Sequence, residues 1–349
     1  MRSAGPSREP SSGRRIPLER VPAPPPHRLA ATWRQADPER IEACLQHAQA
    51  RDPGGWYVAA TSADVAAGTS TVRDVAGQEV MFWRAPDATL HAGPGACPHL
   101  GARLDGCPVT GSVVHCRWHG LALTPQGLPD WRPYPAVDDG VLVWVRLPTR
   151  GETAIDQPRL TRRPPPAQSV AAVIRLRGRC EPQDVIANRL DPWHGSWFHP
   201  YAFSHLRVDE AASTYDTLAL DVTFRLGTKW GVPVRAEFSC PDARTIAMHI
   251  VDGEGAGSVV ETHATPIGTD HLGAPVTDVI EATIAHSERS GFQAARRLQS
   301  LMRPAMRRVA RRLWVDDMVY AERRYELRAG ERGLRLLRHE VTSPDARHA

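Results

Sequence analysis

Two short segments of this chain each place one cysteine close to one histidine. Cys97 and His99 are separated by one residue, and Cys116 and His119 are separated by two. Glycines, which permit sharp turns, stand nearby at Gly101, Gly106, Gly111 and Gly120. Each segment therefore offers one thiolate and one imidazole on a tight loop, and two such loops can hold one cofactor between them.

This donor set matches a Rieske-type [2Fe-2S] cluster, in which two cysteines hold one iron and two histidines hold the other. Neutral histidines also raise the reduction potential relative to an all-cysteine cluster. Zinc is the alternative, but zinc sites normally pair two cysteines in one segment and two histidines in another. Because each half is mixed here, we predict that Cys97, His99, Cys116 and His119 bind a [2Fe-2S] cluster.

A second group of candidate ligands follows about 75 residues later. Two histidines and one carboxylate form the facial triad of non-haem Fe(II) oxygenases. His194 and His199 are five residues apart, which is about 140° off-axis on a regular helix, so both can face one metal only if the helix is distorted or ends between them. Asp191 lies three residues before His194 and shares its helical face. Alternatively, Asp191 followed by Pro192 would only begin a helix as its N-cap.

A third iron ligand is expected near the end of a long helix. Asp316 and Asp317 stand side by side there. Counted from Val309 and Leu313, the helical spacing admits either carboxylate. The residues alone leave this choice open.

The pattern of apolar runs and turn residues predicts an α+β chain. Short β-branched runs separated by Gly, Pro and Asp extend from Trp56 to Leu147 and predict a small all-β module. A Pro-rich linker is expected from Arg162 to Pro166. Beyond it, five strand candidates predict an antiparallel sheet, and one long helix from about Arg289 to Arg328, with a possible kink at Pro304, should cover that sheet. The strand candidates are Leu218 to Phe224, Val234 to Ser239, Thr245 to Val251, Ser258 to Thr265 and Val276 to Ile284.

These elements divide the 349 residues into five parts. They are a disordered N-terminal tail (1–36), a short helix and linker (37–53), the cluster domain (54–150), an iron-containing catalytic domain (165–328) and a C-terminal tail (329–349).

Composition limits the cellular location and the kinds of binding partner that we expect. The formal net charge is only +4 and no basic tract is interleaved with aromatics, which argues against nucleic-acid binding. No apolar run approaches the roughly 18 to 20 residues needed to span a bilayer. Arg14 and Arg15 are not followed by an apolar segment, so no export signal is expected. We therefore expect a cytoplasmic protein without a membrane span.

The motifs resemble those of one known family, the Rieske non-haem iron oxygenases of the ring-hydroxylating and steroid-hydroxylating alpha-subunit type. The resemblance covers about residues 54 to 148 and rests on Cys97-Pro98-His99-Leu100-Gly101 and His115-Cys116-Arg117-Trp118-His119-Gly120, and it continues in the pattern Asn188-x-x-Asp191-x-x-His194-x(4)-His199. One departure is Leu121, where the family usually has an aromatic residue. The respiratory Rieske disulfide is not expected, because Cys107 does not occupy the required position.

The resemblance implies a fold and residue roles. The second domain would be an antiparallel helix-grip (START-like) catalytic domain. His194 and His199 would bind a mononuclear Fe(II), and Asp317 would be preferred over Asp316 as the third ligand. Asp191 would bridge to a cluster histidine of a neighbouring subunit, and Asn188 would lie near the iron.

It also implies an activity. The chain would use O2 and electrons from an external ferredoxin or ferredoxin reductase to hydroxylate, demethylate or desaturate a hydrophobic organic molecule, and it would form a homotrimer. The alternative is a Rieske [2Fe-2S] electron-transfer protein without oxygenase activity. Candidate pocket walls are Trp193, Trp197, Trp230, Met248 and Phe292, although such residues are more often simple core.

Overall fold

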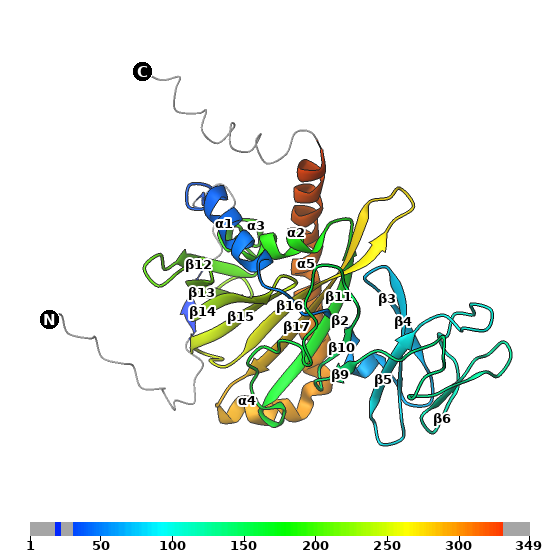
Figure 1. The fold of residues 1–349 in the computed structure, drawn as a ribbon. Helices are drawn as coiled ribbons and strands as arrows, with labels where there is room; N and C mark the ends of the chain where they lie inside the picture. Colours follow the sequence, from blue (N-terminus) through cyan, green and yellow to red (C-terminus); the bar gives the residue numbers. More distant parts are fainter. Residues whose placement is uncertain (1–17, 22–30, 331–349) are drawn as a thin grey trace.

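The computed structural model describes residues 18–21 and 31–330. The short-stranded domain packs beside a larger domain that consists of one sheet and several helices (Figure 1). Within the expected N-terminal tail, β1 (Glu19–Arg20) pairs with β14 of the large sheet. The predictions for the remainder of that tail and for the C-terminal tail lie outside the described residues.

The first domain is all-β, as predicted, and every strand pair in it is antiparallel. Its strands form three small sheets, in the orders β2-β10-β9, β3-β4-β5 and β6-β7-β8. The strands are β2 (Trp56–Thr61), β3 (Thr71–Val75), β4 (Gln78–Arg84), β5 (Leu90–Pro94), β6 (Val109–Thr110), β7 (Val113–His115), β8 (Ala122–Leu123), β9 (Ala136–Asp138) and β10 (Leu142–Arg146).

The second domain is built on one antiparallel sheet in the order β11-β17-β16-β15-β14-β13-β12. The five predicted strands are confirmed, and β11 and β12 were not predicted. The strands are β11 (Ser169–Gly178), β12 (Phe203–Val208), β13 (Thr217–Leu226), β14 (Trp230–Asp242), β15 (Thr245–Gly253), β16 (Val259–Thr269) and β17 (Pro275–His286).

Helices cover one face of this sheet. The predicted N-terminal helix is α1 (Pro38–Gln49), with Asp37 as its cap. Two short helices, α2 (Pro182–Arg189) and α3 (His194–Phe198), lie between β11 and β12. The long helix α5 (Gln299–Ala329) runs across the sheet and packs on β11 and α2 (Figure 1).

The prediction of one continuous helix from Arg289 was wrong at its beginning. The structure has α4 (Ser290–Ala295), then a 3₁₀ turn η4 (Arg296–Leu298), and only then α5. Pro304 has no N–H to donate and its ring crowds the preceding turn. Because α5 begins only five residues earlier, Pro304 lies in the second turn of the helix, and the N–H that it lacks would have donated to the Ser300 carbonyl.

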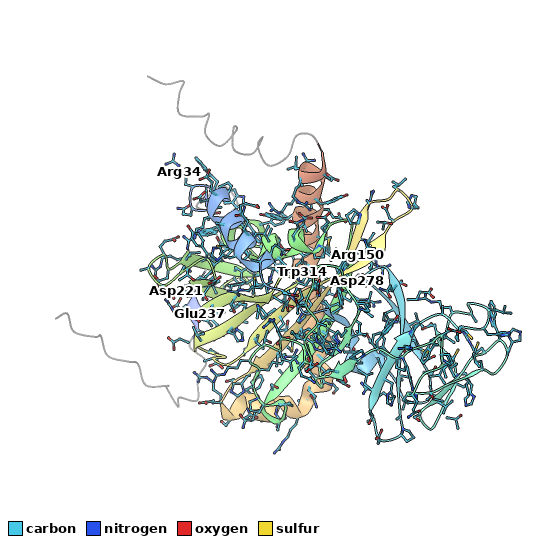
Figure 2. The ribbon with its side chains drawn as sticks, viewed as in Figure 1. Arg34, Arg150, Asp221, Glu237, Asp278 and Trp314 are labelled. Carbon is cyan, nitrogen blue, oxygen red and sulfur yellow. The ribbon has the colours of Figure 1, made fainter. Side chains whose placement is uncertain are left out.

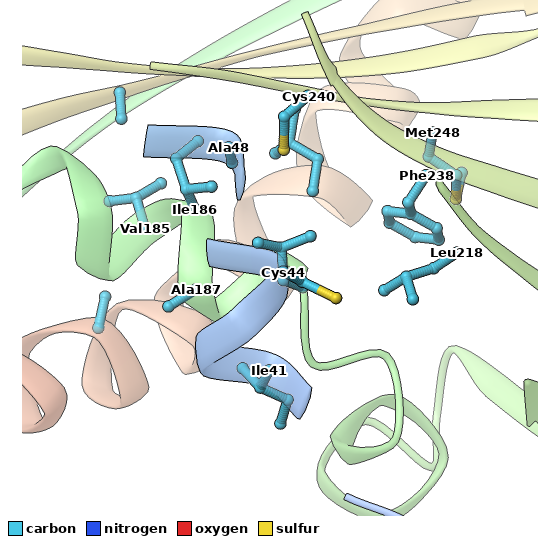
Figure 3. Close-up of a cluster of buried hydrophobic side chains, with 14 of the residues drawn as sticks. Ile41, Cys44, Ala48, Val185, Ile186, Ala187, Leu218, Phe238, Cys240 and Met248 are labelled. Carbon is cyan, nitrogen blue, oxygen red and sulfur yellow. The ribbon is translucent and has the colours of Figure 1, made fainter. Parts of the chain in front are cut away.

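The main core lies between the sheet and its helices. Figure 3 shows the part where α1 and α2 meet the strands. Cys44 and Ala48 come from α1, Ile186 comes from α2, and Phe238 and Met248 come from β14 and β15. Since each is buried, this cluster holds α2 firmly against the sheet, and the end of α2 begins the second candidate site.

The two domains share a packed interface. Trp56 and Trp144 of the first domain lie in one apolar cluster with Ile280 and Ala282 of β17. At this interface Arg163, within the expected linker, forms ion pairs with Asp139 of the first domain and Glu261 of β16. Burial alone would raise the pKa of Glu261, but hydrogen bonds from Arg163 and His263 lower it to about 2 from 4.5.

Replacing Arg163 with glutamine is expected to destabilise the fold by about 3–5 kcal/mol, because removing one partner leaves the buried Glu261 carboxylate uncompensated. In the native protein the pKa of Glu261 is below its unfolded value, so its contribution is present above pH 4.5 and is lost as the pH falls towards 2. In Arg163→Gln the pKa of Glu261 in the folded protein rises, so the loss of stability as the pH falls towards 2 disappears.

Urea unfolding from neutral to acidic pH measures both effects. Arg207→Gln is the matched control, because its ion pair with Asp221 is exposed and such pairs contribute about 0–1 kcal/mol. Equal losses in the two variants would contradict the role given to Arg163.

Candidate metal centres

The two Cys/His loops of the first domain have the same backbone structure. In the first, the Cys97 N–H donates to the Ala102 carbonyl at 2.8 Å, and Gly101 donates back to the Cys97 carbonyl at 2.9 Å. In the second, the Cys116 N–H donates to the Leu121 carbonyl at 3.0 Å, and Gly120 donates back at 2.8 Å. Both glycines have positive φ, +73° and +74°, a conformation that favours glycine over residues with a Cβ.

These loops bring the four candidate cluster ligands together. Cys97 and Cys116 are buried, whereas His99 and His119 are exposed at the tip, with ring centroids 4.8 Å apart. Backbone amides of His99 and Trp118 approach the two sulfurs. Two inner thiols and two outer imidazoles fit a cluster whose cysteine-bound iron is inside and whose histidine-bound iron faces outward.

The second site is formed where α2, α3 and α5 converge. α3 ends at Phe198, and His199 follows with φ −118° and ψ 54°. This confirms that the helix ends between the two histidines, which lets both side chains face one point. The ring centroids of His194 and His199 are 5.4 Å apart.

Asp317 of α5 completes this group. Its Oδ1 lies 3.1 Å from His194 Nε2 and 2.8 Å from His199 Nε2. The three side chains each offer a ligand atom within 4.8 Å of the others. This arrangement of two imidazoles and one carboxylate suits a divalent iron with open positions.

The electrostatic environment of the site favours the charged forms of Asp317 and His194. Burial would raise the pKa of Asp317, but hydrogen bonds from His194 and His199 hold it well below its usual range. Burial would lower the pKa of His194, but its hydrogen bond to Asp317 and the charges of Asp191 and Asp317 raise it.

Hydrogen-bond partners outside the site determine which ring nitrogen of His194 and of His199 faces Asp317. His194 Nδ1 contacts the backbone carbonyl of Asp191, which can only accept a hydrogen bond, so Nδ1 carries a proton and Nε2 is the ring nitrogen that faces Asp317. The Tyr201 hydroxyl donates to Asp316 at 2.6 Å and lies 3.3 Å from His199 Nδ1. Such partners fix the tautomer and orientation of metal-binding histidines.

The neighbouring carboxylates have different environments. Asp316 has a partly exposed side chain and lies 3.6 Å from His199 Nδ1, on the side of the ring away from Asp317. Asp191 is buried, and burial raises its pKa. Its Oδ2 accepts from the Tyr320 hydroxyl at 3.3 Å, and its Oδ1 has no partner among the described residues. The N-cap of α3 is Trp193, so the alternative role of Asp191 as a helix cap does not hold.

Asn188, at the end of α2, is fully buried and donates to Asp317 Oδ1 at 3.2 Å. The structure therefore brings Asn188, His194, His199 and Asp317 to one point, with Asp191 beside it. Sequence reasoning missed Tyr201 and Tyr320, which contact this group from outside the quoted motif.

A cavity of about 640 Å³ opens beside the two histidines. Of the five side chains suggested as pocket walls, Met248 lines it, whereas Trp193 belongs to the core, and Trp197 and Trp230 are about half exposed. That suggestion was therefore largely wrong, because it ranked residues by size without knowing which face of the sheet they occupy. The apolar lining includes Phe203, Leu206, Leu220, Val222, Phe224, Phe238, Met306 and Leu313.

Family comparisons identify the first domain. A model described as Rieske [2Fe-2S] domain matches residues 55–145, and a second model, described as Domain of unknown function (DUF5914), matches residues 149–332. Because the second match spans more than half of the chain, the protein belongs to the DUF5914 family, with a Rieske [2Fe-2S] domain preceding that match.

Curated relatives include the iron-sulfur subunit of the toluene-4-sulfonate monooxygenase system of Comamonas testosteroni, 26% identical over 183 residues. That alignment spans 48% of this chain and 51% of the relative. The vanillate O-demethylase oxygenase subunit of a Pseudomonas species is 24% identical over 171 residues, 45% of this chain and 47% of the relative. The chain therefore spans about half the length of these relatives.

Solved structures extend the likeness to most of the fold. Dicamba monooxygenase bound to dicamba has a TM-score of 0.58 at 17% identity, covering 84% of this chain and 91% of that one. A carbazole-bound oxygenase in complex with ferredoxin, from carbazole 1,9a-dioxygenase, has a TM-score of 0.54 at 12% identity, covering 85% and 88%. These structures show that the two-domain fold is that of Rieske oxygenases. None of the helices in the described ranges is both long and apolar enough to cross a bilayer.

Proposed function

We propose that this chain is the oxygenase component of a Rieske non-haem iron system that oxidises a hydrophobic organic molecule with O2. The observation that carries the proposal is the convergence of His194, His199 and Asp317 beside a largely apolar cavity. In this reading Cys97, His99, Cys116 and His119 hold a [2Fe-2S] cluster that supplies single electrons, and the facial triad holds an Fe(II) that supplies the activation of O2.

Other residues of the site would bind the substrate and orient the metal ligands. Apolar walls bind the substrate and exclude water, which strengthens the polar interactions at the site. Asn188 donates a hydrogen bond to Asp317 and so fixes the orientation of that carboxylate. Tyr201 and the Asp191 carbonyl hold the two imidazoles with their Nε2 atoms inward.

Electrons must reach this chain from another protein, for which we propose a ferredoxin or ferredoxin reductase. The exposed His99 and His119, with Trp118 beside them, offer a contact surface for such a donor. A ferredoxin complex is known for the structurally similar carbazole-bound oxygenase. We also propose a cytoplasmic homotrimer in which the Asp191 carboxylate accepts a hydrogen bond from His119 of a neighbouring copy.

The proposal can be tested with the reconstituted protein and a reduced ferredoxin. Oxygen consumption that depends on an added hydrophobic compound, with an oxidised product detected by mass spectrometry, is the expected result. A cluster that is reduced and reoxidised without any substrate-dependent product, across a broad set of apolar compounds, would favour the alternative of an electron-transfer protein.

A further inference from the structure

One carboxylate in the cavity does not belong to the metal-binding group. Glu281 lies on β17, lines the cavity and is only 4% exposed. Side chains alternate along a strand, and Ile280 and Ala282 on either side face the first domain. Glu281 therefore points to the same face as α5 and the metal-binding residues.

One oxygen of this carboxylate has all the protein contacts. Oε2 accepts from Trp314 Nε1 at 2.5 Å and from Thr262 Oγ1 at 3.3 Å, and Arg189 Nη2 lies 3.5 Å away. Figure 2 shows Trp314 in the interior, where α5 crosses the sheet. Three donors around one oxygen hold the side chain in a single orientation.

The other oxygen is available to a ligand. Among the described residues nothing donates a hydrogen bond to Glu281 Oε1, and this atom is not one of the sealed, unpartnered polar atoms of the interior. A substrate that fills the cavity would displace water from this oxygen, and a carboxylate oxygen that loses its water is costly unless another donor reaches it. Most of the surrounding wall is apolar, so the substrate itself is the natural source of that donor.

We infer that Glu281 determines specificity in this cavity by accepting a hydrogen bond from a hydroxyl group on an otherwise apolar substrate. The inference rests on the proposed function, which takes the cavity as the substrate site. It names the substrate class as an alcohol or phenol. A methyl ether has no hydrogen to donate and would lack this contact.

Glu281 lies close enough to the candidate metal ligands for this hydrogen bond to orient the substrate beside them. Trp314, which holds Glu281, lies three residues before Asp317 on the same face of α5. Three residues correspond to about 4.5 Å along a helix. A hydroxyl bound at Glu281 would therefore orient the rest of the molecule beside Asp317, with the apolar body held by the cavity walls.

The test compares two naphthalene probes of similar size: 2-naphthol and 2-methoxynaphthalene. Equilibrium dialysis against the anaerobic, metal-loaded protein gives a Kd for each without any need for turnover. We expect 2-naphthol to bind about tenfold more tightly than its methyl ether. In Glu281→Gln the alcohol preference should shrink to within about threefold, because an amide oxygen is a weaker acceptor than a carboxylate oxygen.

Glu237→Gln is the matched control, since Glu237 belongs to the same sheet but lines a separate cavity; it should keep the native ranking. A purely structural role for Glu281 would change stability without changing the ratio of the probe affinities. The inference is overturned if wild-type protein does not bind 2-naphthol, if it binds the ether equally well, or if Glu281→Gln keeps the full preference. The wild-type ranking decides even if that variant fails to fold. Failure of the oxygenase proposal would appear separately, as absence of product despite this ranking.

Discussion

Replacing His194 with alanine is expected to remove the mononuclear iron and to abolish substrate oxidation while leaving the visible absorption of the [2Fe-2S] cluster unchanged. His194 supplies one of the two nitrogen donors that converge on Asp317, and the described residues place no third histidine in this group. The cluster ligands belong to the other domain, so their loops should be unaffected. Iron analysis, absorption spectra and oxygen consumption of the same preparation measure all three effects.

His271→Ala provides the control, because His271 is exposed in the turn between β16 and β17. This variant should retain both metal centres and full turnover. Unchanged iron content in His194→Ala would show that the histidine is an ordinary hydrogen-bonded residue, and the proposed iron site would have to be abandoned.

Replacing Asp191 with alanine is expected to leave both metals bound but to slow electron transfer from the reduced cluster by about 10- to 100-fold, the usual cost of losing an outer partner of a metal ligand. Asp191 is buried and lies beside His194, and one of its carboxylate oxygens has no hydrogen-bond partner among the described residues.

A single-turnover experiment resolves this step. The cluster is first reduced without oxygen, then mixed with substrate and oxygen, and its reoxidation is followed by absorption. Asp221→Asn serves as the control, because Asp221 is a partly exposed surface carboxylate paired with Arg207. Native reoxidation kinetics in Asp191→Ala would eliminate the bridging role even if the iron site stands.

The candidate ligands could be proposed from the sequence because the pattern that points to them is local. Cys97 with His99, and Cys116 with His119, each lie within one short loop, and the spacing of His194 and His199 itself required a helix that ends between them. The choice of Asp317 over Asp316 came only from the resemblance. In the structure, adjacent positions on α5 point to opposite sides of His199, a distinction that helical spacing counted from Val309 and Leu313 could not make.

The cavity could not be predicted, because its walls come from strands and helices far apart in the sequence. Glu281 resembles an ordinary surface residue in the sequence, yet β17 is covered on both faces, by the first domain and by α5. Strand β11 carried a signal that was overlooked: Val170, Val173 and Ile174 form a β-branched run typical of a strand. The break before α5 depends on packing at the helix end, which periodicity does not report.

Metal and sulfide analysis of the wild-type protein, purified without oxygen, tests the central claim most directly. The account predicts two irons and two sulfides for the cluster, plus a further iron for the facial triad, with negligible zinc. A protein that contains zinc in place of iron, or that lacks acid-labile sulfide after full cofactor assembly, would contradict it.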